Sequence, residues 1–427
     1  MNLNCGFVGL PNVGKSTLFN ALSKNNIAAE NYPFCTIEPN TGIVEVPDER
    51  LNSLTKIFNP EKTIHNTVEF IDIAGLVKNA HQGEGLGNQF LSQIRSVNVI
   101  IQVVRFFNDN NIAHVENRVD PLDDMEIINT ELILADIKTV ERSLEKNVKL
   151  IKANKPEGRL AEEVLTNLLN HMNKGLAARS FERNSKENPV IKNLFLLTDK
   201  PMIYVANIDE NTDSADLYQG ALEIAKKNKS SLIKINGKLE SEMAEFDEEE
   251  KKIILEDYGI KESGLDTLIK EAYNTLGLET FFTCGEKEVR AWTMKKGSQA
   301  VEAAGEIHTD FSTKFIKAEI FTYKDAINNK EKINELKTMG LVKMVGRDYI
   351  MQEGDGSAYF LNIGFTHTVV NSGNTPRVSL MFSLKDQSDL QEIPEGDWNE
   401  TNNMGSLRIT NNYKQHKAEA DAQQLAV

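Results

Sequence analysis

The stretch 9–17, GLPNVGKST, constrains the fold of this chain more than any other feature. It fits the pattern G-x-x-x-x-G-K-[ST], with an apolar run at Phe7 and Val8 before it and a periodic run beginning at Leu18 after it. A strand, a glycine-rich turn and a helix in this order form a phosphate-binding loop, in which N–H groups of the turn and the helix N-terminus face phosphate oxygens. The stretch therefore predicts an α/β fold with a nucleotide site.

The residue types in this loop suggest their separate roles. Lys15 is expected to reach the β- and γ-phosphates, which makes it a candidate catalytic residue, and the Ser16 hydroxyl to ligate Mg²⁺. The alternative is a fortuitous turn between a strand and a helix, and the partner motifs described below argue against it. The predicted nucleotide-binding residues of the loop are Asn12, Val13, Gly14, Lys15, Ser16 and Thr17.

Length and composition set the broad class of the protein. A chain of 427 residues with 40% hydrophobic residues predicts about three domains, and no apolar run is long enough to span a membrane. The start of the chain leads directly into the first predicted strand, so we expect no signal peptide. Cys5, Cys35 and Cys284 lack metal-site spacing, which suggests free thiols in a reducing cytoplasm.

Charge is distributed unevenly along the chain. The net charge of −15 disfavours general nucleic-acid binding. Residues 132–200, however, carry 13 Lys and Arg against 9 Asp and Glu. This segment is the one most suited to an anionic partner, the alternative being an ordinary solvated helix face.

Two further motifs are typical of a switch nucleotide site. The loop 31–40 contains two prolines and Thr36, whose hydroxyl and carbonyl would meet Mg²⁺ and the γ-phosphate. A later strand ends in a D-x-x-G motif, in which Asp72 would hold the Mg²⁺ shell through water and the Gly75 N–H would sense the γ-phosphate. The predicted metal-site residues are therefore Ser16, Thr36 and Asp72.

The residue that positions the attacking water is not evident from the motifs. Small GTPases carry a water-orienting Gln after D-x-x-G, whereas this chain has Leu76, which cannot polarise water. His114 follows the predicted strand 100–104 on a polar loop, where ligands of open α/β sheets bind. His114 is thus a candidate catalytic residue, although a lone histidine is more often satisfied by its neighbours. The glycine-rich stretch 81–87 is expected to be a flexible second switch.

A helical period replaces the strand pattern between residues 127 and 172. Apolar residues recur at steps of three and four from 127 to 153 and again from 160 to 172, and the turn 154–158 separates the two runs. This pattern predicts an antiparallel helical hairpin that interrupts the nucleotide fold.

The base-recognition motif departs from that of GTPases. GTPases have N-K-x-D after the strand that is predicted here at 202–206, and this chain has Asn207-Ile208-Asp209-Glu210. Glu210 stands where GTPases carry the Asp that accepts hydrogen bonds from the guanine N1–H and N2 amine, and Ile208 stands where they carry the Lys. Adenine lacks these two donors and so does not need the Asp. The changed motif therefore favours ATP over GTP. The adenine N6 amine could bond to Asn207 or to a backbone carbonyl. Asn236 and Gly237 follow the last predicted strand, on the base side of the site.

These motifs together resemble the Obg-like ATPases, the YchF group, over residues 1 to about 355. The matching stretches are 9–17, 31–40, 72–76, 81–88, 207–210 and 289–293. The resemblance implies a translation-factor-type nucleotide domain (1–131 and 201–277), an inserted helical arm (132–200) and a C-terminal β-grasp TGS domain (278–356). It also implies ATP preference, ribosome association through the arm and the TGS domain, and K⁺ held near Asn12. We expect a cytoplasmic monomer with no membrane and no specific DNA partner.

The tail 357–427 does not follow the family. Residues 364–380 resemble the C-terminal part of aspartyl/asparaginyl hydroxylase-like 2-oxoglutarate oxygenases, with His367 and Arg377 at the spacing of an iron ligand and a 2-oxoglutarate-binding arginine. A working site also needs an upstream metal ligand, and the His308-Thr309-Asp310 run belongs to the TGS pattern. We therefore expect no iron or 2-oxoglutarate binding, and we expect residues 357–363 to add a strand to the TGS sheet. Fusion, frameshift and mis-assembly stay open as origins of the tail.

The leading hypothesis is a Mg²⁺-dependent ATPase with a low intrinsic rate that acts as a switch at the ribosome. The alternatives are a GTPase and a nucleotide-gated ribosome-binding scaffold in which hydrolysis is incidental.

Overall fold

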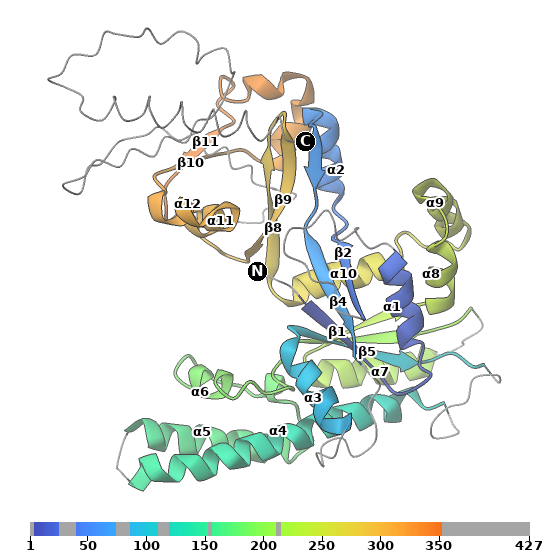
Figure 1. Cartoon of the computed structure of the whole chain (residues 1–427), viewed down its shortest axis with the longest axis vertical. Helices are drawn as coiled ribbons and strands as arrows, with labels where there is room; N and C mark the ends of the chain where they lie inside the picture. The colour runs from blue at the N-terminus through green and yellow to red at the C-terminus, as the bar shows by residue number, and fades with distance from the viewer. Residues whose placement is uncertain are drawn as a thin grey trace, which may run out of the picture.

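The computed structural model describes residues 4–24, 40–73, 86–109, 119–152, 156–210 and 215–351. At its centre lies a six-stranded sheet with the order β2-β4-β1-β5-β6-β7 (Figure 1). Strand β2 runs antiparallel to β4, and the other neighbours are parallel. The strands are β1 (Asn4–Val8), β2 (Thr41–Glu45), β4 (Thr67–Asp72), β5 (Val99–Arg105), β6 (Met202–Asn207) and β7 (Ser231–Ile235).

Helices cover both faces of this sheet. Helices α1 and α10 lie on one side, and α3, α4 and α7 lie on the other (Figure 1). Strand β5 is buried at every residue, which explains why its sequence reads as a nearly continuous apolar run. The helices are α1 (Lys15–Lys24), α3 (Leu86–Ser96), α4 (Pro121–Lys152), α7 (Ala215–Lys227) and α10 (Gly264–Thr275). Helix α8 (Gly237–Met243) packs against α1, and α9 (Glu248–Asp257) follows α8.

The topology brings the separate motifs to one edge of the sheet. Strands β1, β4, β5 and β6 are parallel, so their carboxyl ends lie at the same edge. The phosphate loop follows β1, Asp72 ends β4, and Asn207 ends β6. The strand order reverses around β1, and this is where open α/β sheets bind their ligands.

The predicted helical hairpin is present, and its first helix begins within the nucleotide domain. Helix α4 packs lengthwise against α5 (Pro156–Met172), with Val140, Val164 and Leu168 in a shared apolar cluster. Helix α4 begins at Pro121, earlier than the helical period that starts at residue 127, and its first turns bury Met125 in the main core. One continuous helix therefore joins the arm rigidly to the sheet. The chain returns through η3 (Ala178–Ser180) and α6 (Asn188–Lys192).

The C-terminal region is built on a second, smaller sheet. Strands β8 (Leu278–Cys284) and β9 (Glu288–Lys295) form an antiparallel hairpin, and β3 (Lys62–Ile64) from the N-terminal half pairs with β9 in parallel. Beside them, β10 (Ala318–Ile320) pairs with β11 (Lys343–Val345). The remaining elements here are α2 (Glu49–Phe58), α11 (Ala300–Ile307), α12 (Thr309–Lys314), α13 (Tyr323–Asn328) and η4 (Lys330–Glu335).

The structure describes His308 of this region but not the tail. His308 is the N-cap of α12, and its Nδ1 accepts a hydrogen bond from the Asp310 N–H at 3.2 Å, which is a structural role rather than a metal-binding one. The tail 357–427 lies outside the described residues, so its predicted strand stays a prediction. Among the residues that the structure describes, none of the helices is both long and apolar enough to cross a membrane.

Candidate nucleotide-binding site

The phosphate loop has the backbone geometry that its sequence predicts. Asn12 and Gly14 have positive φ values of 63° and 88°, so the turn curls tightly between β1 and α1. A Cβ atom on Gly14 would lie 2.1 Å from Asn207 Nδ2. Both the left-handed conformation and this close approach therefore require glycine at residue 14.

Three side chains converge beyond the loop. The Lys15 ammonium contacts the Asp72 carboxylate, and the Ser16 hydroxyl donates to Asp72 Oδ2 at 3.2 Å. Lys15 is only 11% exposed and Asp72 15%, so the pair is largely withdrawn from water. Thr17 lies on the exposed side of the first turn of α1. A carboxylate next to a hydroxyl supplies the hard oxygen ligands that Mg²⁺ prefers, so these residues fit the metal.

The structure gives Asn207 a role other than contact with the base. Its Nδ2 donates to the Val13 carbonyl at 2.9 Å, and its Oδ1 accepts from the Gly237 N–H at 3.0 Å. The side chain is buried, and both polar groups are engaged within the protein. Asn207 therefore ties the phosphate loop to the start of α8, and its contact with an adenine amine stays a prediction.

Asn236 and Gly237 also serve the local structure. Asn236 is the N-cap of α8, and its side-chain oxygen accepts from the Leu239 N–H at 3.1 Å. A Cβ on Gly237 would lie 2.9 Å from Asn207 Oδ1. Close packing against Asn207 thus requires a residue without a side chain here, and the base-side loop is held rigidly next to the phosphate loop.

The two unusual residues of the base motif differ in their surroundings. Ile208 is half-buried and packs against the main core. Glu210 is exposed, and its Oε1 accepts a hydrogen bond of 3.1 Å from the Tyr258 hydroxyl, which follows α9. The hydrogen bond to Glu210 and the charge of that carboxylate raise the pKa of Tyr258 above its ordinary value. Tyr258 has no marker in the sequence, because it lies 48 residues from its partner.

A buried arginine organises the loop that follows β5. Arg105 is almost fully buried, its Nε donates to the Phe107 carbonyl at 3.3 Å, and its guanidinium lies 4.6 Å from the centre of the Phe107 ring. The Asn108 N–H donates to Asp209 Oδ2 at 3.2 Å, which links this loop to the base motif. Arg105 directly follows the predicted strand 100–104, and no sequence motif indicates this role.

The remaining predicted site residues cannot be placed. Thr36, Gly75, Leu76 and His114 all lie outside the described residues. The described part of the post-β5 loop ends at Asp109, and Arg105 Nη2 donates to its carbonyl at 3.1 Å. The backbone is therefore held in place as far as Asp109, and the role of His114 stays a prediction.

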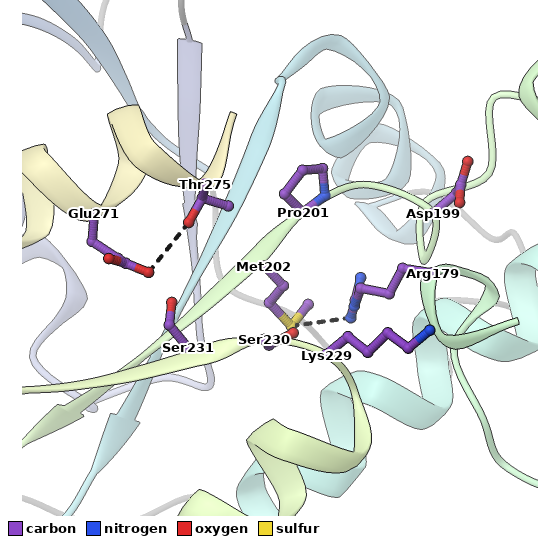
Figure 2. Close-up of a pocket in the computed structure, with 9 residues that line it drawn as sticks. All are labelled: Arg179, Asp199, Pro201, Met202, Lys229, Ser230, Ser231, Glu271 and Thr275. Carbon is purple, nitrogen blue, oxygen red and sulfur yellow. Dashed lines mark hydrogen bonds between the residues drawn. The ribbon is translucent and has the colours of Figure 1, made fainter. Parts of the chain in front are cut away.

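A separate cavity of about 370 Å³ lies at the opposite edge of the sheet (Figure 2). It is bordered by Met202 and Ser231, at the amino ends of β6 and β7, and by Arg179. The Arg179 guanidinium donates to the carbonyls of Thr198 at 3.0 Å and Lys200 at 2.7 Å, and burial lowers its pKa. This arginine cross-links the base of the arm to the sheet, and the cavity is remote from the phosphate loop.

The fold and the site together define a P-loop NTPase with a translation-factor-type nucleotide domain. A family model described as "50S ribosome-binding GTPase" matches residues 4–155. A second model, YchF-GTPase_C, described as "Protein of unknown function (DUF933)", matches residues 278–362. The second match continues to residue 362, so the expectation that the chain departs from the family at residue 357 is wrong for residues 357–362. The strand predicted at 357–363 stays a prediction.

Curated relatives identify the family. A protein named "Ribosome-binding ATPase YchF" from Bacillus subtilis is 49% identical over 367 residues, which are 85% of this chain and 100% of the relative. The protein of the same name from Escherichia coli O157:H7 is 44% identical over 364 residues, with the same coverage. The solved structure of the Schizosaccharomyces pombe YchF GTPase matches with a TM-score of 0.74 and 35% identity, covering 84% of this chain and 97% of that one. The chain belongs to the YchF family.

Proposed function

We propose that this protein is a Mg²⁺-dependent ATPase that acts as a nucleotide switch on the ribosome. The observation that carries the proposal is the convergence of Lys15, Ser16 and Asp72 beyond a correctly formed phosphate loop. The relatives named ribosome-binding ATPases, each matched over its full length, support the substrate and the partner.

Each residue of the site is assigned a separate role in binding or hydrolysis. Lys15 faces the β- and γ-phosphates and stabilises the negative charge that develops as the γ-phosphoryl group leaves. The Ser16 hydroxyl, the Asp72 carboxylate and Thr36 would hold Mg²⁺. The bound metal would supply positive charge that neutralises the phosphates. Asn12, exposed on the turn, is the residue to which we assign K⁺, and the Gly75 N–H is assigned the sensing of the γ-phosphate.

Selection of the base follows from Glu210. A carboxylate positioned for guanine accepts two hydrogen bonds from the base, whereas Glu210 already accepts one from Tyr258 at 3.1 Å. Ile208 supplies an apolar residue where GTPases carry a lysine stem. This arrangement favours ATP over GTP, and a GTPase is the alternative within the same chemistry.

Water positioning decides between an active switch and a passive scaffold. Leu76 cannot orient water, so we assign this role to His114. His114→Ala should then lower turnover at least about tenfold with little change in ATP affinity, because the histidine acts only in the transition state. Equal turnover in variant and parent would leave His114 a structural residue and favour a scaffold with incidental hydrolysis.

The test of the proposed function is nucleotide hydrolysis with and without ribosomes. We expect slow ATP hydrolysis by the protein alone, a change in rate on addition of ribosomes, and weaker competition by GTP than by ATP. We assign the ribosome contacts to the helical arm and the C-terminal domain, and we place the protein in the cytoplasm as a monomer. Equal use of GTP would support the GTPase alternative, and failure to sediment with ribosomes would contradict the proposed partner.

A further inference from the structure

Phe195 stands out from every other large apolar side chain in the described structure. It is 76% exposed, and its backbone has a positive φ of 50°. A bulky residue is strained in the left-handed region, which glycine and asparagine adopt more readily. An exposed aromatic ring also forgoes the stabilisation that burial would bring. The fold itself therefore gains nothing from phenylalanine at this residue.

The backbone around Phe195 is firmly held on both sides. The Phe195 N–H donates to the Lys192 carbonyl at 3.2 Å, and Arg95 Nη1 donates to the Phe195 carbonyl at 3.3 Å. Just beyond, the Asp136 carboxylate accepts from the Leu197 N–H at 2.9 Å. The ring thus projects from a pre-organised loop, which lowers the entropy lost when a partner binds.

Arg95 connects this loop to the nucleotide domain. It lies in the last turn of α3, the helix that follows the D-x-x-G segment. Its own carbonyl accepts from Lys200 Nζ at 3.0 Å. The Phe195 backbone is therefore tied to the helix that follows the D-x-x-G motif.

Two basic residues hold the Phe195 backbone: Arg95 donates to its carbonyl, and the Lys192 carbonyl accepts from its N–H. Arg95 and Lys192 are exposed, and the neighbouring acidic residue Asp199 is paired with Arg183 at 2.8 Å. The surrounding segment 132–200 has an excess of basic over acidic residues in a chain whose net charge is −15. An anionic partner is complementary to this surface.

We propose that Phe195, Arg95 and Lys192 form a docking point for RNA, with an unpaired base stacked on the ring and the flanking phosphates on the two cations. Aromatic rings stack on any base, and basic side chains follow the phosphate backbone, so such a point needs no specific sequence. The inference rests on the proposed function, because it names ribosomal RNA as the component that meets the base of the arm.

Ribosome binding by the full-length protein tests this surface. Phe195→Ala should weaken the affinity for purified ribosomes about tenfold, the loss expected for one stacked base. Phe195→Trp should keep the affinity, because it keeps a stacking ring. The matched control is Phe246→Ala, which removes another exposed ring, 44% exposed and lying between Glu245 and Asp247, and should bind as the parent does.

A stability measurement separates docking from a structural role. Phe195→Asn relieves the backbone strain, so its midpoint of urea unfolding should equal or exceed that of the parent while its ribosome affinity falls. A lower midpoint together with unchanged affinity would show that the ring serves the fold, and would overturn the proposal.

Crosslinking identifies the partner molecule. A photoreactive benzoylphenylalanine at residue 195 should label ribosomal RNA, and labelling of ribosomal protein alone would overturn the RNA assignment. If the parent and Phe195→Ala sediment equally with ribosomes, the docking proposal is wrong and the proposed function stands. If the parent itself does not sediment, the proposed function fails first.

Discussion

At the scale of single residues, the phosphate site depends on a few side chains brought together from distant strands. Lys15 and Ser16 begin α1, Asp72 ends β4, and the three meet because β1 and β4 are parallel neighbours. Gly14 allows the loop to pack on Asn207. Each of these residues can therefore be changed with a specific consequence.

Lys15→Ala should remove most ATP affinity or turnover and leave the fold intact, because it deletes the cation that faces the β- and γ-phosphates. Nucleotide binding and hydrolysis assays, with circular dichroism as the test of folding, measure this. The matched control is Lys24→Ala at the other end of α1, where the lysine is exposed and pairs with Glu245. Hydrolysis by Lys15→Ala at the parent's rate would contradict the switch mechanism.

Tyr258→Phe should raise the affinity for GTP relative to ATP by about threefold, because it frees the Glu210 carboxylate from the phenol. Adding Glu210→Asp and Ile208→Lys should shift the preference further toward GTP, since these changes restore the guanine-binding motif. Competition binding gives the ratio. Tyr218→Phe serves as the control, because its hydroxyl donates to the Leu232 carbonyl instead. An unchanged ratio in all these variants would place base selection elsewhere.

At the scale of elements, the helical arm is joined to the sheet by a buried polar network. Asp136 on α4 accepts hydrogen bonds from the Leu197 N–H at 2.9 Å and from the Thr198 N–H at 2.7 Å. Burial raises the pKa of Asp136 to about 6, although these hydrogen bonds act in the opposite direction. Arg179 completes the junction by donating to three backbone carbonyls. The arm is therefore positioned by polar contacts as well as by the continuity of α4.

This junction gives the stability a defined pH dependence. Because the pKa of Asp136 is raised on folding, the folded protein binds a proton between about pH 4 and pH 6 that the unfolded chain does not. The binding of this proton by Asp136 therefore adds to the free energy of unfolding at low pH, and the added stability is lost as the pH rises through 6.

Urea unfolding of the parent and of Asp136→Asn at pH 5 and pH 7 measures this contribution. Asp136→Asn should be less stable at both pH values, because one of the two oxygens that accept from Leu197 and Thr198 becomes an NH₂ group facing a backbone N–H. The parent's advantage should be about 1 kcal/mol larger at pH 5 than at pH 7. Exposed Asp257→Asn should show no such difference. An advantage that is larger at pH 7 would mean that hydrogen bonding outweighs burial at Asp136.

At the scale of the whole molecule, the C-terminal region is interlocked with the nucleotide domain. Strand β3 pairs with β9, and Leu51 and Leu54 of α2 pack in one cluster with Phe282. Asn66 donates to the Thr280 hydroxyl at 3.1 Å across the same boundary, and to the Tyr273 hydroxyl of α10 at 3.2 Å within the nucleotide domain. Residues 40–73 thus contribute to both sheets.

Truncations test where the C-terminal domain ends. Met351, the last described residue, is fully buried in the C-terminal cluster, and its N–H donates to the Ser298 carbonyl at 2.9 Å. The family match continues to residue 362. Truncation after Ile363 should therefore leave ATP hydrolysis unchanged, whereas truncation after Asp355 should lower the unfolding temperature of this domain. Calorimetry and the hydrolysis assay measure the two effects.

Metal and co-substrate assays on the full chain test the rest of the tail. Purified protein should contain no stoichiometric Fe²⁺ and should release no succinate from 2-oxoglutarate, because His308, the upstream candidate for an iron ligand, serves as the N-cap of α12. Bound iron or succinate release would contradict our interpretation of residues 364–427.

The sequence alone determined the phosphate loop, the strands that carry the motifs and the helical hairpin, because each depends on local patterns. Glycine and lysine spacing, buried apolar runs and helical periodicity act over a few residues, and the structure confirms the loop at 9–17 and the hairpin of α4 and α5. The same patterns identified the family, since its motifs are short and ordered along the chain.

The tertiary structure decided what the polar side chains do once the strands are assembled. Asn207 bonds to Val13 and Gly237, and Glu210 accepts from Tyr258, a partner 48 residues away. The same holds for Phe195, whose carbonyl accepts a hydrogen bond from Arg95 of α3, 100 residues away in the sequence. Such contacts join residues that are distant in sequence, so their geometry is set by how the elements pack and leaves no periodic signal in the chain.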